Sequence, residues 1–107
     1  MKNSEIGLTE NQEIFLLKVF EKYEFIDTVV VYGSRAKGNY TNRSDLDIVI
    51  FGKANDRFEL ANVLNEIEET SFPYNVDLQL ISDIKNQQLL EHINRVGKTF
   101  YKRKGIE

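Results

Sequence analysis

The chain has 107 residues, of which 41% are apolar, 29% charged and 11% aromatic, and its net charge is −3. This length fits one domain, spanning residues 1–107, and the composition is typical of a folded globular protein. The lack of cysteine excludes disulfides and thiolate zinc sites, a single histidine excludes a histidine-rich metal centre, and the acidic balance disfavours binding to duplex nucleic acid.

The N-terminal third of the chain predicts a helix followed by a strand. Thr9 and Gln12 have the spacing of a capping box, and apolar residues recur behind them at helical spacing to about residue 23. The run TVVVY, residues 28–32, is apolar throughout and rich in β-branched side chains, which predicts a strand buried on both faces. Gly33 ends this strand, and the SRAK segment behind it is long enough for one helical turn.

The rest of the chain predicts two further strands, each followed by a helix. A strand is expected over Asp45–Gly52 and a helix over residues 56–69. YNVDLQLI, residues 74–81, alternates as a third strand, and a last helix is expected from Asp83, its cap, to Gly97. The order αβαβαβα indicates an α/β or α+β fold in which helices cover one sheet. The aromatic side chains are expected in its core, among them Phe15, Phe20, Phe25 and Phe58.

Three aspartates alternate with apolar residues on the second and third predicted strands. Successive side chains of a strand point to opposite faces, so Asp45 and Asp47 share one face and the apolar residues between and after them share the other. Asp77 has the same relation to its apolar neighbours on the third strand. If these two strands are neighbours, the three carboxylates form one cluster.

Such a cluster indicates a cation, because neighbouring like charges raise one another's proton affinity. Mg²⁺ prefers carboxylate and phosphate oxygens, and carboxylates at this spacing can converge on two Mg²⁺ ions. A phosphate site is therefore expected nearby. Gly33 lets a ligand approach the backbone closely, and Ser34 adds a hydroxyl where the next helical turn begins, so both are expected to contact phosphate.

A Walker A loop is the competing interpretation of the glycine segment. Gly33 and Gly38 have the spacing of that motif and follow a predicted strand. Asn39 and Tyr40, however, stand where the motif requires lysine and then serine or threonine. The segment therefore lacks both the cation and the metal-binding hydroxyl of a Walker A loop.

What the chain presents instead is Gly-Ser, ten residues, then Asp-x-Asp, with a further aspartate on a later strand, in the segments "GSRAKG", "SDLDIVI" and "FPYNVDLQLI". This resembles the polymerase-β-type nucleotidyltransferase superfamily, in particular its minimal nucleotidyltransferases (MNT), from the first helix to about residue 101. The resemblance implies a small mixed sheet flanked by helices. It also implies transfer of a nucleoside monophosphate from an NTP, with ATP as the expected donor, to a hydroxyl group.

The same resemblance implies two sets of site residues. The metal ligands, expected to hold two Mg²⁺ ions, are Asp45, Asp47 and Asp77. Of these, Asp77 is also expected to help activate the acceptor hydroxyl. The triphosphate contacts are expected to be Gly33 and Ser34, with phosphate charge neutralised by Arg35 and Lys37. His92 and the basic residues near the C-terminus are interpreted as packing or solvated surface.

Similar minimal proteins work beside a helical HEPN-domain protein, often as the antitoxin of a toxin–antitoxin pair. The leading hypothesis is therefore AMP transfer to a HEPN-domain toxin. A non-catalytic module that neutralises a partner by occlusion is an alternative, and transfer to a small molecule such as an aminoglycoside is another. No apolar run approaches the roughly twenty residues that cross a bilayer, and no basic start followed by an apolar block opens the chain, so a cytoplasmic protein is expected.

Overall fold

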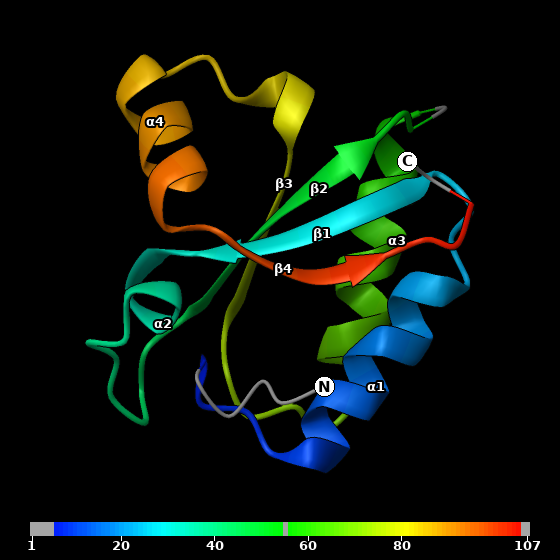
Figure 1. Ribbon diagram of the computed structural model, residues 1–107. Helices are drawn as coiled ribbons and strands as arrows, with labels where there is room; N and C mark the ends of the chain where they lie inside the picture. Colours follow the sequence, from blue (N-terminus) through cyan, green and yellow to red (C-terminus); the bar gives the residue numbers. More distant parts are fainter. Residues whose placement is uncertain (1–5, 55, 106–107) are drawn as a thin grey trace.

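The structure is a computed structural model that describes residues 6–54 and 56–105. Four α-helices, four strands and a short 3₁₀ turn make up these residues (Figure 1). In chain order they are α1 (Glu10–Glu21), β1 (Ile26–Tyr32), α2 (Gly33–Lys37), β2 (Leu46–Gly52), α3 (Arg57–Glu68), β3 (Val76–Leu80), the 3₁₀ turn (Ile81–Asp83), α4 (Gln87–Val96) and β4 (Lys98–Lys102). Among the described helices, none combines the length and the apolar character that a bilayer crossing requires.

The strands form one mixed sheet in the order β3-β2-β1-β4. β1 pairs antiparallel with both β2 and β4, whereas β2 and β3 run parallel. A parallel pair needs a crossover connection, and α3 provides it. The predicted α+β fold, a small mixed sheet flanked by helices, is thereby confirmed.

The main core lies between the sheet and the two helices α1 and α3, which pack on the same face (Figure 1). On β2 the alternation predicted from the sequence holds, because Leu46, Ile48 and Ile50 are all fully buried in this core. Val63 and Ile67 of α3 pack against the same face. The alternate side chains of β2, starting with Asp47, must therefore point to the opposite face.

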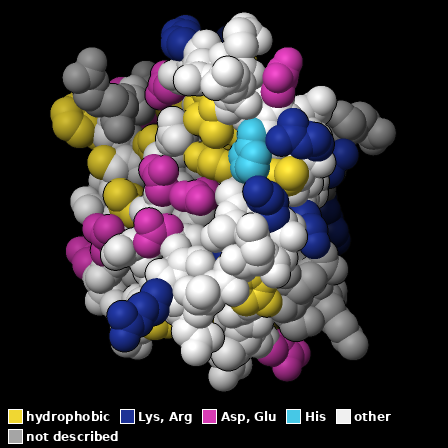
Figure 2. Space-filling model, turned by 90° about the vertical axis from the view of Figure 1, so that its left-hand side faces the viewer, with side chains coloured by type: hydrophobic (Ala, Val, Ile, Leu, Met, Phe, Trp, Pro, Cys, Tyr) yellow, Lys and Arg dark blue, Asp and Glu magenta, His cyan; other side chains and the backbone are white. Residues whose placement is uncertain are grey.

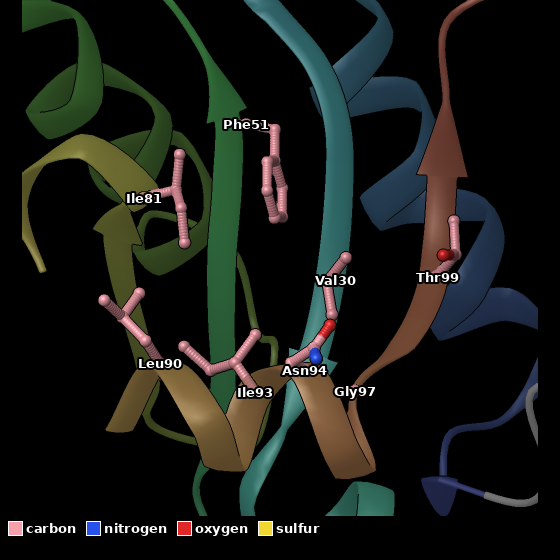
Figure 3. Close-up of a pocket in the computed structure, with 8 residues that line it drawn as sticks. All are labelled: Val30, Phe51, Ile81, Leu90, Ile93, Asn94, Gly97 and Thr99. Atoms are coloured by element: carbon pink, nitrogen blue, oxygen red, sulfur yellow. The ribbon is translucent and has the colours of Figure 1, made fainter. Parts of the chain in front are cut away.

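The opposite face of the sheet carries a smaller apolar cluster beneath α4. Tyr32, Val49, Ile84 and Ile93 are buried there. Beside α4 the sheet is left partly open, and a groove of about 350 Å³ lies between the helix and the strands (Figure 3). Its floor includes Phe51. Helix α4 thus covers this face of the sheet only in part. The face was predicted to be polar, but it is polar only where β2 and β3 begin and is apolar further along the strands.

Side chains cap the N-termini of α1, α3 and α4, and the cap of α4 corrects a prediction. Thr9 and Gln12 form the predicted capping box of α1, and Asp56 caps α3 by accepting from the N–H groups of the first turn. The prediction that Asp83 caps the last helix is wrong. Asp83 ends the 3₁₀ turn, and Asn86 caps α4 by accepting from the Leu89 N–H at 3.0 Å.

The strand β4 is absent from the predicted order. Its sequence, KTFYK, is short and begins and ends with lysine, as is common for edge strands. Its aromatic residues nevertheless pack inward, since Phe100 and Tyr101 both lie against Phe20. Arg103 follows the strand and donates to the backbone carbonyls of Ile26 at 2.8 Å and Tyr23 at 2.6 Å, which ties the end of β4 to the start of β1. This part of the basic C-terminal segment is therefore structural.

The assignment of Phe58 to the core is also wrong. Its ring is 68% exposed in the first turn of α3, whereas Ile67 in the same helix is 1% exposed. We expect Phe58→Ser to change the free energy of unfolding by no more than about 0.5 kcal/mol. Ile67→Val, a smaller chemical change, should cost about 0.5–1.5 kcal/mol because it removes a buried methyl group. Urea denaturation of the two variants measures both values, and a larger loss for Phe58→Ser would contradict the exposed position.

Candidate active site

The end of β1 and the start of β2 bring Gly33 and Asp47 together. Tyr32, the last residue of β1, pairs with Asp47 in the antiparallel ladder, and Gly33 follows with φ of +77°. A Cβ atom at Gly33 would collide with the Asp47 carboxylate. Glycine is therefore required here both for the left-handed backbone and for the close approach of Asp47.

The carboxylates of β2 and β3 lie side by side because the two strands are neighbours in the sheet, which meets the condition set in the sequence analysis. Asp47 and Asp77 are register partners in the parallel pair β2–β3, and Asp45 directly precedes β2. Asp47 is half-buried, whereas Asp45 and Asp77 are exposed. Burial, followed by the negative charges of Asp77 and then Asp45, raises the pKa of the Asp47 carboxyl above its ordinary value. The cluster thus holds mutually repelling charges that a bound cation would relieve.

Tyr32, Gln79 and His92 line the same region, and none of them was predicted as a site residue. The Tyr32 hydroxyl accepts a hydrogen bond from Gln79 Nε2 at 3.1 Å. Burial raises the pKa of Tyr32, the charges of Asp77 and Asp47 add to the increase, and the Gln79 hydrogen bond opposes it. The His92 ring stands edge-on to Tyr32 with centroids 6.2 Å apart. The position of Tyr32 directly before Gly33 could have identified it as a site residue. It was interpreted as part of a buried strand because it ends the apolar run TVVVY.

The α2 segment supplies the residues predicted to meet phosphate. Ser34 is half-buried in its first turn, next to Gly33, and Lys37 is exposed at its last residue. Arg35 is in a different position from the one predicted. Its guanidinium is buried and donates to backbone carbonyls of Ile6 and Ser44, so it is not exposed to an incoming phosphate. The surface of this side of the molecule carries a group of acidic side chains, with lysine and arginine side chains around it (Figure 2).

The carboxylate cluster fits Mg²⁺ that arrives with a nucleotide. Within residues 6–54 and 56–105, no three histidine, cysteine, aspartate or glutamate side chains form a ready metal cage. Mg²⁺ does not require one, because it is usually bound by one or two carboxylates together with substrate phosphates and water. Asp47 and Asp45 meet this requirement, and a bound cation would offset the burial and the neighbouring charges of Asp77 and Asp45 that raise the pKa of Asp47. The assignment of metal ligands stays a prediction.

A family model described as polymerase beta, nucleotidyltransferase, matches residues 15–105. This match covers most of the chain and includes β1, α2, β2 and β3 with the glycine turn and the aspartates. The chain therefore belongs to the polymerase-β nucleotidyltransferase family. No curated protein sequence matches it significantly.

Solved structures share the fold at low sequence identity. A chain of a toxin–antitoxin crystal structure with AMP-PNP is 20% identical, with a TM-score of 0.67 over 91% of this chain and 76% of that one. A chain of the tri-AMPylated Shewanella oneidensis HEPN toxin in complex with MNT antitoxin is 14% identical, with a TM-score of 0.66 over 91% and 75%. A proposed nucleotidyltransferase of Sulfolobus solfataricus is 20% identical, with a TM-score of 0.51 over 92% and 94%. At these identities the likeness shows the fold.

Proposed function

We propose that the protein is a Mg²⁺-dependent nucleotidyltransferase that moves AMP from ATP onto a hydroxyl group of a HEPN-domain toxin and so acts as its antitoxin. The observation that supports this best is the cluster at the edge of the sheet. Asp47 lies half-buried against Gly33, with Asp77 paired beside it and Asp45 two residues before it in the chain. A protein that only binds its partner has no evident need for such repelling charges.

Each residue of the cluster then has a role in the reaction. Asp45 and Asp47 would hold Mg²⁺. When bound, this ion supplies positive charge that offsets the negative charge of the phosphates and of the departing oxygen. Gly33 and Ser34 would contact the triphosphate from the α2 side, with Lys37 exposed nearby to pair with phosphate charge. These contacts would orient the α-phosphorus toward the acceptor.

The chemical step is an in-line displacement. The acceptor oxygen forms a bond to the α-phosphorus, the bond from that phosphorus to the bridging oxygen breaks, and pyrophosphate leaves. Asp77 would help to bind the metal and take the proton of the acceptor hydroxyl. It is exposed on β3, which is an outer strand of the sheet, so an acceptor on a second protein can approach it from that side.

The identity of the acceptor is proposed from two similar structures. One is a toxin–antitoxin structure with AMP-PNP, and the other contains a tri-AMPylated HEPN toxin with MNT antitoxin. Because this chain shares their fold and has a carboxylate cluster of its own, we propose the same kind of partner and the same transferred group. A tyrosine hydroxyl is a suitable acceptor because its phenolate is a better nucleophile than an alkyl hydroxyl near neutral pH.

Incubation with ATP labelled in the α-phosphate, Mg²⁺ and a candidate HEPN-domain partner protein tests this proposal. We expect label on the partner, and no label when both Asp45→Asn and Asp47→Asn are present. Label that appears equally with the double variant would exclude these carboxylates from catalysis. Stable binding of the partner without label at any Mg²⁺ concentration would support the occluding module instead. Label on an aminoglycoside in the absence of any partner would identify a small-molecule acceptor.

A further inference from the structure

Arg35 carries a buried charge next to the proposed phosphate contacts. It is 1% exposed, and of the described residues it has the largest fully buried side chain. Burying a guanidinium is unfavourable unless its donors find acceptors, so a position of this kind needs a compensating arrangement. The sequence pattern, in which Arg35 follows Gly33 and Ser34, does not reveal this burial.

The guanidinium joins three segments that are distant in the chain. Nε donates to the Ser44 carbonyl at 3.1 Å, and Nη1 donates to the Ile6 carbonyl at 2.9 Å. The guanidinium carbon lies 4.1 Å from the centroid of the Tyr74 ring and 5.2 Å from that of Tyr40. These distances are in the range of cation–π interactions.

Two of these segments lead directly into the strands that carry the carboxylates. Ser44 precedes Asp45, and Tyr74 lies three residues before Asp77. The two lead-in segments are also joined to each other, because the Leu46 N–H donates to the Asn75 carbonyl at 2.8 Å. A shift of Arg35 would therefore be transmitted to the backbone on both sides of the cluster.

Two further features indicate that the arrangement serves more than stability. Gly7, with φ of +82°, leaves room for the Arg35 guanidinium and the Tyr40 ring. A Cβ at this position would lie 2.5 Å from Arg35 Nη1 and 2.6 Å from Tyr40 Cε1. Arg35 Nη2, in addition, is buried and has no hydrogen-bond partner among the described residues. A buried donor without an acceptor lowers stability, so an apolar side chain would serve a purely structural position better.

We propose that Arg35 is a positioning residue for the carboxylate cluster. Its guanidinium holds the backbone at Ser44 and the ring of Tyr74, and thereby sets Asp45 and Asp77 at the distances that bind a divalent cation together with a nucleotide. This role rests on the proposed nucleotidyltransferase function. Side chains that hydrogen-bond a metal ligand directly typically change metal affinity about 10–100-fold when they are removed. Arg35 acts through the backbone next to Asp45, so we expect an effect at the lower end of this range.

Binding of Mn²⁺ in the presence of AMP-PNP, followed by electron paramagnetic resonance, tests the proposal without turnover. We expect Arg35→Met to raise the Mn²⁺ dissociation constant about tenfold or more. Arg35→Lys keeps the charge but not the planar fork, and we expect it to show a similar loss. Tyr74→Leu keeps Arg35 and removes the ring against which it packs, and we expect it to weaken Mn²⁺ binding severalfold. This variant replaces the arginine variants in the test if they do not fold.

Arg103→Met is the matched control. Arg103 also donates to two backbone carbonyls, of Tyr23 and Ile26, and lies 5.8 Å from the Tyr101 ring centroid, but it acts at the start of β1, at the opposite end of that strand from the cluster. We expect this variant to lower the melting temperature and to leave the Mn²⁺ dissociation constant unchanged. An equal weakening in Arg103→Met would overturn the proposal, since it would reflect stability alone.

The outcomes separate this inference from the proposed function. Folded Arg35 variants that bind Mn²⁺ as tightly as the wild type overturn the positioning role and leave the function standing. A wild-type protein that binds Mn²⁺ with AMP-PNP but labels no acceptor overturns the transferase function, and the effect of Arg35→Met on binding still decides the positioning role. A wild-type protein that binds no Mn²⁺ with AMP-PNP overturns both.

Discussion

Asp47→Asn should abolish nucleotidyl transfer while making the metal-free protein more stable. We expect activity to fall by at least about a hundredfold, the effect found when one group that stabilises developing charge is removed. We expect the melting temperature of the metal-free protein to rise at neutral pH, because the variant removes a half-buried negative charge that faces Asp77 and Asp45. Transfer assays and differential scanning calorimetry measure the two effects.

The gain in stability should depend on pH in a defined direction. Burial and the neighbouring carboxylates raise the pKa of Asp47 in the folded state above its unfolded value. The folded protein therefore binds this proton more tightly, and the stabilising contribution is complete below the unfolded pKa and lost as the pH rises through the folded one. The advantage of Asp47→Asn should consequently be present at neutral pH and disappear in acid, where Asp47 is neutral too.

Asp83→Asn is the control for this result. It also removes one negative charge, but Asp83 is exposed at the end of the 3₁₀ turn. We expect neither the activity nor the melting temperature to change appreciably. A loss of stability in Asp47→Asn at neutral pH would contradict the repulsion described for the cluster.

Gly33→Ala should disrupt the site more than an ordinary glycine substitution would. The backbone at Gly33 is left-handed, which costs an alanine about 1–2 kcal/mol. The new methyl group would also overlap the Asp47 carboxylate, so either Asp47 or the turn must move. We expect a loss of activity on the order of a hundredfold together with weaker Mn²⁺ binding, since both depend on the placement of Asp47.

Gly38→Ala separates the two contributions. Gly38 is the C-cap residue that follows α2, with φ of +90°, and an added Cβ there would meet no atom within 4 Å. It should therefore cost a similar amount of stability from backbone strain while retaining activity within a few-fold. If the two variants lose activity equally, the loss comes from strain in α2 and not from the contact between Gly33 and Asp47.

The parts of the fold that follow local rules could be predicted from the sequence. The capping box of α1 and the alternation on β2 both depend on residue spacing over a few positions. The sequence left open whether β2 and β3 are neighbours, and their parallel pairing places Asp47 beside Asp77. The roles proposed for these aspartates remain for experiment.

The parts that depend on distant contacts could not be predicted. Arg35 is buried because Ile6, Ser44 and Tyr74 converge on it, and no short segment contains this information. β4 is short and flanked by lysines, and its strand character comes from pairing with β1. Phe58 matches the helical spacing of apolar residues, yet it occupies the first turn of α3 beyond the edge of the sheet's core.

The parallel pairing of β2 and β3 has a practical consequence for studying this protein. Both strands begin at the end of the sheet that carries the aspartates. The chain therefore leaves β2 at Gly52, about 17 Å from Asp47 at the usual rise per residue. An affinity tag or a fluorophore placed next to Lys53, which is exposed, would lie at the remote end of the molecule. Labels at that end can report on partner docking without obstructing the nucleotide.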